Sequence, residues 1–203
     1  MRCILDCGSF TEWMAIQKGK NVKPIDLDEY IQFIKENSDV IEHYFVKDEI
    51  GNHRKTMENL RYMETCGLTP IPVFHMSTNL AELDKLVMEY PVIGIGGTVN
   101  QKNRETFLTE VFLRYPKIAF HGLGITKAEI LMNYPFYLVD SSAWLNSRRE
   151  DKAKVLTRNG QEKRTDLSVI ERVVQSIKFL SSLELPKTFR GINFIGEQIS
   201  FYF

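Results

Sequence analysis

Two aspartates stand where an apolar stretch of the chain ends, one near the start of the sequence and one in its last third. Asp140 follows the apolar run 136–139, and Asp6 follows the shorter run 3–5. Such runs are typical of buried strands, and a carboxylate at this position is costly unless it is hydrogen-bonded, paired or used in chemistry. Two carboxylates can supply a nucleophile and a general acid/base. If both strands belong to one parallel sheet, the two aspartates form one site.

The ends of the other expected strands also carry residues suited to chemistry. These residues are Asp48, His75, Gly96 with Gly97, and His121 followed by Gly122-Leu123-Gly124. Each has a structural interpretation, because an aspartate caps a turn, a glycine pair permits a tight turn and a lone histidine is often satisfied in a core. A structural role in turns does not readily explain why every strand of the series carries such residues at the same end. The pattern therefore indicates one site built from strand ends.

Short apolar runs alternate with amphipathic segments over the first two thirds of the chain. This alternation predicts repeated strand–helix units with short connections. The expected strands are 2–6, 40–46, 71–74, 92–95, 118–120 and 136–139, and the expected helices are 26–37, 55–65, 80–90, 104–114 and 127–133. Gly67 is expected to cap the second helix at its C-terminus, and Thr126 to cap the last one at its N-terminus.

Repeated strand–helix units predict the α/β class, with a parallel sheet covered by helices. An open doubly wound sheet concentrates its site at one switch point, whereas a closed (β/α) barrel gathers every strand end around one mouth. The even spread of the candidate residues favours a TIM-type barrel. We expect one domain over residues 1–203, trimmed relative to the usual barrel of about 250 residues, with atypical closing strands after residue 150.

The last third of the chain departs from this alternation. Residues 148–165 are polar and basic, with Asn159-Gly160 in the middle, and this dipeptide is a strong signal for a hairpin turn. A hairpin or loop insertion is expected here. A long amphipathic helix over 167–183 and one or two strands over 189–203, around Gly196, are expected to follow.

The composition is that of a globular protein with balanced charge. The chain has 26 basic and 26 acidic side chains among its 203 residues, which argues against a strongly electrostatic nucleic-acid binder but leaves room for a local basic patch. The three cysteines lack zinc-ligand spacing, so we expect no metal and no cofactor. An odd number of cysteines without a signal peptide fits the cytoplasm. No run approaches the roughly 18 apolar residues of a membrane span.

Taken in order over residues 3–145, these motifs resemble those of the tRNA-guanine transglycosylases, including their compact phage-type and DNA-directed relatives. Residues 5–10, Leu-Asp-Cys-Gly-Ser-Phe, are similar to the family's Asp-Ser-Gly-Gly-Phe motif, and Val139-Asp140 falls on its Phe-Asp pair. Residues 45–49 resemble its Phe-Asp-Glu strand end, residues 93–97 its Val-Gly-Gly strand, and residues 121–124 its Met-Gly-Val-Gly loop.

The resemblance implies a base-exchanging glycosyltransferase that replaces guanine in a polynucleotide, DNA in preference to tRNA, by a 7-deazaguanine derivative. Asp140 would be the nucleophile that holds a covalent glycosyl-enzyme intermediate, and Asp6 the general acid/base that protonates the leaving base and deprotonates the incoming one. A target base inside a duplex would first be flipped out. The substrate-binding residues that the resemblance implies are Asp48, His75, Gly96, Gly97, His121, Gly122 and Ser9.

This sequence departs from the family's pattern in three respects. His75 stands where the family has the glutamine that recognises the base, which leaves the identity of the base open. No cysteine follows Cys66, so the zinc site of the tRNA enzymes is missing, and the chain has no room for an added RNA-binding domain. The implied partners are a polynucleotide, DNA or tRNA, and a free purine or 7-deazapurine base. The implied location is the cytoplasm, that of the host if the protein is phage-encoded.

The basic segment that follows the expected nucleophile strand is the candidate nucleic-acid contact. Its candidate residues are Arg148, Arg149, Lys152, Lys154 and Arg158. A solvated hairpin is an equally good interpretation, since acidic residues dilute the patch. Trp13 and Trp144 either stack on a base or pack in the core. The aromatic residues 201–203 could pack on a second copy, which leaves a homo-oligomer open.

Two other functions remain compatible with the sequence. One is a hydrolase on the same barrel, which would cleave a base or nucleoside with water as the acceptor. The other is a non-catalytic phage interaction protein that keeps the fold.

Overall fold

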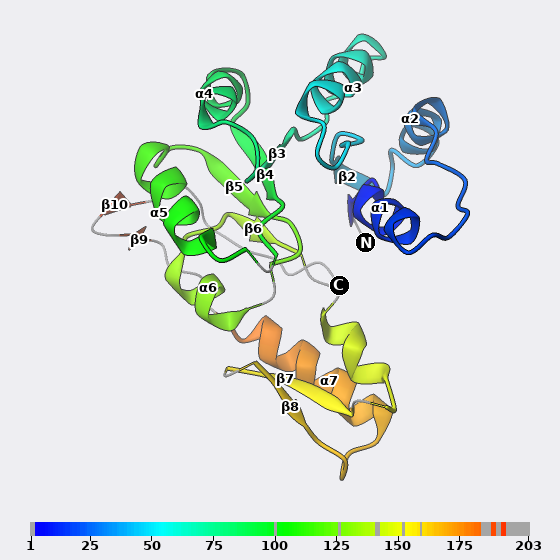
Figure 1. Cartoon of the computed structure of the whole chain (residues 1–203), viewed down its shortest axis with the longest axis vertical. Coiled ribbons are helices and arrows are strands. Elements are labelled where there is room, and N and C mark those ends of the chain that lie inside the picture. Colours follow the sequence, from blue (N-terminus) through cyan, green and yellow to red (C-terminus); the bar gives the residue numbers. More distant parts are fainter. Residues whose placement is uncertain are drawn as a thin grey trace. The chain divides into compact units, whose positions relative to one another are not determined.

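The computed structural model describes residues 3–99, 101–125, 127–140, 143–151, 153–158, 160–183, 188–189 and 192–193. Its helices and strands are labelled in Figure 1. The chain is of the mixed α/β class, as predicted, and divides into two compact units, the first running to Gly96 and the second starting at Gly97. The single domain and the barrel stay predictions. In the described part of the chain, no helix is both long and apolar enough to cross a membrane.

The first unit repeats a strand followed by one or two helices. Its elements are β1 (Cys3–Leu5), α1 (Ser9–Gln17), α2 (Leu27–Glu36), β2 (Ile41–Tyr44), α3 (His53–Thr65), β3 (Val73–His75), α4 (Leu80–Glu89) and β4 (Val92–Gly96). Strand β1 pairs in parallel with β2, and β3 pairs in parallel with β4. A parallel bridge between Phe45 and Ile71 connects the segments next to β2 and β3. Parallel pairing places the carboxyl ends of these strands at the same edge.

Side-chain caps explain where helices α2, α3 and α4 begin, whereas α1 has Gly8 at its N-cap and no side-chain cap. The Asp26 carboxylate accepts hydrogen bonds from the amides of Asp28 and Glu29 at 3.0 and 2.9 Å, which fixes the start of α2. Asn52 caps α3 and Asn79 caps α4 in the same way. These helices bury apolar faces that their sequence spacing predicted, Leu83 and Leu86 on α4 for example.

The second unit contains one parallel strand pair and two antiparallel pairs. Its elements are α5 (Arg104–Arg114), β5 (Ala119–Gly122), α6 (Ala128–Asn133), β6 (Leu138–Val139), the 3₁₀ helix η1 (Ala143–Arg148), β7 (Lys154–Thr157), β8 (Gly160–Lys163), α7 (Val169–Ser181), β9 (Thr188–Phe189) and β10 (Ile192–Asn193). Strands β5 and β6 are parallel, whereas β7 with β8 and β9 with β10 are antiparallel. The Phe112 ring packs against Phe120, Tyr134 and Phe136 in the core of this unit.

The antiparallel pair β7–β8 confirms the hairpin expected within residues 148–165, and Thr157 of β7 pairs with Gly160 of β8. Asn159, on which the predicted turn depends, lies outside the described residues. Helix α7 lies along β7 (Figure 1). The buried Ser176 hydroxyl of α7 accepts a hydrogen bond from the Leu156 amide at 3.0 Å, which attaches the helix to the hairpin.

The predicted strands and helices are present, with shifted boundaries and a few differences. Gly67 has a φ of 82° directly after the C-cap residue of α3, as a glycine cap requires. Helix α6 has Lys127 at its N-cap, whereas the predicted cap Thr126 lies outside the described residues. Strands β9 and β10 pair with each other ahead of the expected position at Gly196, which lies with residues 194–203 outside the described part. Helices α1 and η1 were not predicted.

Candidate functional site

A buried polar cluster lies at the carboxyl ends of the strands of the first unit. His75 ends β3, and its Nε2 is 2.9 Å from Oδ2 of Asp48. The other oxygen of Asp48, Oδ1, accepts a hydrogen bond from the Cys7 thiol at 3.0 Å. Cys7 Sγ is also 3.2 Å from the Ser9 hydroxyl at the start of α1. The cluster therefore joins residues that follow β1, β2 and β3.

Asp48 is ionised in this cluster despite its burial. Burial raises the pKa of its carboxyl, but hydrogen bonds from His75 and Cys7 outweigh that effect, so the pKa is lowered overall. An ionised carboxylate only accepts hydrogen bonds, so Nε2 of His75 carries the proton that lies between them. The same surroundings raise the pKa of the Cys7 thiol. Burial and the charges of Asp48 and Asp6 raise the pKa of Cys7 to about 12, so it is protonated at neutral pH and is a poor nucleophile.

Four hydrogen bonds fix the irregular segment that carries Asp48 beyond β2. The Tyr30 hydroxyl donates to the carbonyl of Phe45 at 2.9 Å, and the amide of Val46 donates to Ile71. The Asn59 side chain donates to the carbonyl of Lys47 at 2.8 Å. The amide of Glu49 donates to the Thr56 hydroxyl at 2.8 Å. Helices α2 and α3 thus hold the segment on which the buried carboxylate depends.

Gly96, the last residue of β4, lies directly against His75. A Cβ atom at Gly96 would lie 2.8 Å from Cδ2 and 3.1 Å from Nε2 of the imidazole. Real Cβ atoms do not approach other atoms this closely, so only glycine leaves room for the ring in its present position. The glycine predicted to lie close to a base therefore lies close to a side chain of the cluster.

Asp6, the predicted general acid/base, directly follows β1 and is exposed. It belongs to the first unit, next to the cluster, where its charge helps to raise the pKa of the neighbouring Cys7. Asp140, the predicted nucleophile, belongs to the second unit. The partnership of Asp6 with Asp140 stays a prediction.

Asp140 follows β6 and is held by two hydrogen bonds that end on the same oxygen. Nε2 of the buried His121 lies 3.1 Å from Oδ1 of Asp140, and the amide of Gly124 donates to Oδ1 at 3.0 Å. The Asp140 side chain is 46% exposed, while that of His121 is 3% exposed. The carboxylate is thus oriented by the β5 end and its loop, and it is open to solvent.

Glycines shape the loop that donates to Asp140. Gly124 has a φ of 65°, which favours glycine, and its amide is one of the two donors. A Cβ at Gly122 would lie 2.8 Å from Ile125 Cδ1 and 3.0 Å from the Phe136 ring. Gly97, at the start of the second unit, has a φ of 68°. Tight backbone geometry explains these three glycines, and contact with a base stays a prediction.

Among the predicted nucleic-acid contacts, Arg148 ends η1, Arg149 follows it, and Lys154 and Arg158 belong to the hairpin. Arg148 and Arg158 are exposed, and Lys154 on β7 is half-buried. The Arg149 guanidinium pairs with the Asp151 carboxylate through bonds of 3.1 and 3.0 Å, which reduces its availability to a phosphate. Lys152 lies outside the described residues.

The two tryptophans differ in exposure. Trp13 on α1 is 36% exposed and stacks on Phe10, with ring centroids 6.1 Å apart. Trp144 on η1 is half-buried. Stacking of either ring on a base stays a prediction.

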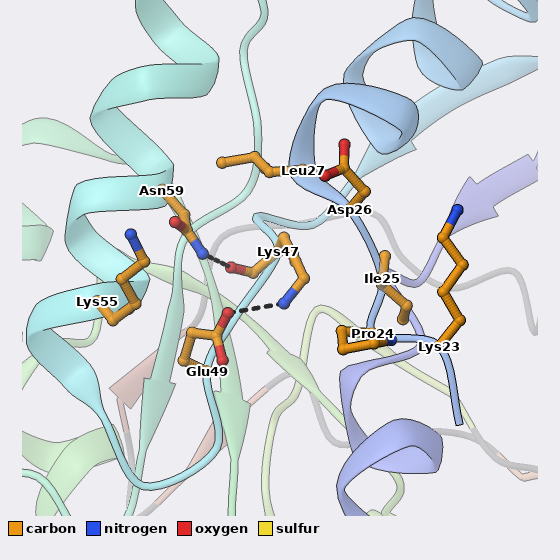
Figure 2. Close-up of a pocket in the computed structure, with 9 residues that line it drawn as sticks. All are labelled: Lys23, Pro24, Ile25, Asp26, Leu27, Lys47, Glu49, Lys55 and Asn59. Carbon is orange, nitrogen blue, oxygen red and sulfur yellow. Dashed lines mark hydrogen bonds and ion pairs between the residues drawn. The ribbon is translucent and has the colours of Figure 1, made fainter. Parts of the chain in front are cut away.

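A cavity of about 420 Å³ in the first unit is lined in part by Lys47 and Glu49, the neighbours of Asp48 in the chain (Figure 2). Its lining residues are Lys23, Pro24, Ile25, Asp26, Leu27, Lys47, Glu49, Lys55 and Asn59. The buried Lys47 ammonium donates to Glu49 Oε1 at 2.7 Å in the middle of this lining (Figure 2). Lys47 and Glu49 line the cavity, whereas Asp48 between them contacts His75 in the cluster.

The predicted site residues are thus found in two groups. Asp48, His75, Ser9 and Gly96 lie together in the first unit, and His121, Gly122 and Asp140 lie together in the second. Sequence reasoning missed Cys7 as the donor to Asp48 and Lys47 with Glu49 as cavity residues. Cys7 directly follows Asp6 in the motif of residues 5–10, and this position was the one sequence signal that Cys7 belongs to the site.

In the described part of the chain, no group of three or more histidine, cysteine or acidic side chains is arranged to hold a metal ion. Comparison of the chain with protein-family models, with curated proteins and with solved structures finds no match.

Proposed function

We propose that this chain is a base-exchanging glycosyltransferase in which Asp140 forms the covalent bond to the sugar. The arrangement of Asp140 is the observation that carries the proposal. Its carboxylate follows a parallel strand, is about half exposed, and accepts both described hydrogen bonds at Oδ1. A carboxylate that is oriented and yet reachable suits attack on an anomeric carbon better than a buried, fully paired one does.

The proposed reaction has two balanced steps. An oxygen of Asp140 bonds to C1′ while the bond from C1′ to the base breaks, and the base leaves with the bonding electrons and takes a proton from Asp6, which enters this step as the protonated acid and leaves it as the carboxylate. The incoming base then loses a proton to Asp6 and bonds to C1′, and the C1′–oxygen bond breaks to restore the carboxylate. Both steps pass through an oxocarbenium-like state.

The buried cluster of the first unit supports a recognition role within this proposal. Asp48 already uses one oxygen for His75 and the other for Cys7, so its present contacts fix the orientation of the imidazole. His75 stands where a base-recognising residue is expected from the resemblance. The proposal therefore assigns Asp48 and His75 jointly to base binding, with Gly96 leaving room for the ring.

We propose in addition that the sheet closes into a barrel and that the substrate is a polynucleotide. The parallel strands of both units would then be parts of a trimmed (β/α) barrel, which would gather Asp6 and Asp140 at one mouth. The substrates would be DNA, or tRNA, and a free purine or 7-deazapurine base. The exposed Arg148 and Arg158 would contact phosphates. The proposed location is the cytoplasm.

An exchange assay tests the proposal. Single-stranded DNA, duplex DNA and tRNA that carry radiolabelled guanine are incubated with the protein, with and without unlabelled 7-deazaguanine. We expect release of labelled guanine from at least one polynucleotide, with 7-deazaguanine incorporated in equal amount. Asp140→Asn should reduce the rate by at least about a thousandfold, as loss of a covalent nucleophile does.

Asp166→Asn is the matched control, because Asp166 is an exposed aspartate of the same unit that has no assigned role. It should exchange at the wild-type rate. Release of guanine without incorporation would instead identify a hydrolase. No release from any of the polynucleotides would contradict both enzymes and favour a non-catalytic interaction protein.

A further inference from the structure

We infer that His121 directs the attack of Asp140 to one oxygen and drives the covalent intermediate toward breakdown. This inference rests on the proposed function and assigns His121 a positioning role at the same site. It follows from the hydrogen-bond geometry around the Asp140 carboxylate. In the motif that this chain resembles, methionine stands at the position of His121, so the contact is a feature of this sequence.

The geometry distinguishes the two oxygens of Asp140. His121 Nε2 and the Gly124 amide both contact Oδ1, at 3.1 and 3.0 Å. A carboxylate oxygen only accepts hydrogen bonds, so Nε2 of His121 carries the proton of this contact. An oxygen that holds two donors is less available as a nucleophile. Oδ2 is therefore the atom that bonds to C1′, and Oδ1 becomes the carbonyl oxygen of the resulting ester.

The fold keeps His121 in place for this task. His121 belongs to β5 and is 3% exposed. It pairs with Leu138 of the parallel strand β6, and the next pair, Gly122 with Val139, leads directly to Asp140. The Asp140 amide also donates to the carbonyl of Gly122 at 3.3 Å. The imidazole and the carboxylate are thus carried on two paired strands.

The strength of the His121 hydrogen bond changes during the proposed reaction. A hydrogen bond to an ionised acceptor is roughly twice as strong as one to a neutral acceptor. Asp140 is ionised before attack and after release, and it is a neutral ester in between. His121 therefore stabilises the carboxylate more than the glycosyl-enzyme, so it lowers the equilibrium amount of the covalent adduct and makes Asp140 a better leaving group.

Measurement of the adduct fraction tests this inference. The protein is mixed with whichever polynucleotide supports exchange, without an incoming base, and the covalent fraction is measured by denaturing electrophoresis at several guanine concentrations. His121→Phe removes the donor, and we expect the equilibrium constant for adduct formation to rise about tenfold, which corresponds to about 1.4 kcal/mol. His121→Gln keeps an N–H donor and should stay within about threefold of wild type.

A structural defect would give the opposite result, because a disordered site forms less adduct. His43→Phe, at an exposed position in the first unit, is the control and should leave the constant unchanged. An equilibrium constant for adduct formation that is unchanged or lower in His121→Phe would overturn this inference but not the proposed function. Equal constants in His121→Phe and His121→Gln would do the same. Absence of any adduct in the wild-type protein would overturn the proposed function and this inference with it.

A second readout examines the contact without turnover. In protein labelled with ¹⁵N at histidine, the Nε2 proton of His121 should be protected from exchange with solvent. Asp140→Ala should shift that resonance and speed the exchange at least about tenfold, whereas Asp166→Ala should change neither. An unchanged His121 resonance in Asp140→Ala would overturn the inference regardless of activity.

Discussion

Nε2 of His75 and Oδ2 of Asp48 lie 2.9 Å apart, and the two side chains are only 7% and 9% exposed. The pair joins the end of β3 to the segment that follows β2. It lowers the pKa of the Asp48 carboxyl despite the opposing effect of burial. A buried charge that loses its partner is strongly destabilising, so this pair supports both the stability of the first unit and the geometry of the proposed base site.

Asp48→Asn should destabilise the folded protein by about 2–4 kcal/mol at pH 7, because it leaves the His75 imidazole without a charged partner. The pKa of Asp48 is lower in the folded state than the unfolded value of about 3.9. The stabilisation is therefore fully present above about pH 4 and is lost as the pH falls through the folded pKa. Urea unfolding from pH 7 down to pH 3 should show the difference between wild type and variant shrinking with acidity.

Asp39→Asn is the control for this measurement, because Asp39 is an exposed aspartate of the same unit. It should unfold within about 0.5 kcal/mol of wild type. A difference between wild type and Asp48→Asn that stays constant down to pH 3 would contradict the ionised state of Asp48.

Gly96→Ala should cost about 1–3 kcal/mol, because the added methyl group would lie 2.8 Å from the His75 ring in a packed environment. A double-mutant cycle with His75→Ala identifies the cause. Once the ring has been removed, the cost of Gly96→Ala should fall below about 0.5 kcal/mol. Equal costs in the two backgrounds would mean that the backbone, and not His75, requires the glycine.

Cys7 should be the least reactive of the three cysteines toward alkylation. Burial and neighbouring carboxylates raise the pKa of Cys7 to about 12, whereas Cys3 and Cys66 are only partly buried. The thiolate is the reactive species, so iodoacetamide at pH 8 should modify Cys3 and Cys66 at least about tenfold faster than Cys7. Peptide mapping by mass spectrometry measures each rate, and in denaturant the three rates should converge. Rapid alkylation of Cys7 in the folded protein would contradict the cluster.

Arg148→Ala and Arg158→Ala should each weaken polynucleotide binding and make it less sensitive to salt. Each lost phosphate contact removes about 0.9 from the slope of log affinity against log salt concentration on duplex DNA. Arg149→Ala should have a smaller effect, because Arg149 is paired with Asp151. Fluorescence anisotropy at several salt concentrations gives these slopes, with the exposed Lys178 of α7 as the alanine control. Equal salt slopes in Arg158→Ala and Lys178→Ala would show that the hairpin does not contact the polynucleotide.

The sequence predicts the elements of this protein best where a helix buries one face. Helices α2 and α4 carry regularly spaced apolar residues that are buried in the structure, and polar caps mark where they begin. Helix α1 was not predicted because its apolar residues are spread around the helix axis, so its sequence has no apolar stripe with helical spacing. Helix η1 is a short 3₁₀ segment without a helical period of its own.

The sequence predicted which residues belong to the candidate site better than it predicted which of them contact one another. The position of His75 at a strand end follows from the apolar run before it. Its pairing with Asp48 depends on the irregular segment after β2, whose course is set by hydrogen bonds to Tyr30 of α2 and to Asn59 and Thr56 of α3. The same holds for His121 and Asp140, which meet because β5 and β6 pair in a particular register. No local sequence pattern specifies that register.

The proposed reaction requires Asp140 to carry the sugar, so a trapped covalent adduct on Asp140 is its most decisive test. The protein is incubated with the polynucleotide that supports exchange, quenched in acid, digested with nuclease and protease, and examined by tandem mass spectrometry. We expect a glycosyl mass on the peptide that contains Asp140, which disappears when excess guanine is added and is absent from Asp140→Asn. A glycosyl group on a different residue, or base exchange at the wild-type rate in Asp140→Asn, would show that Asp140 is not the nucleophile.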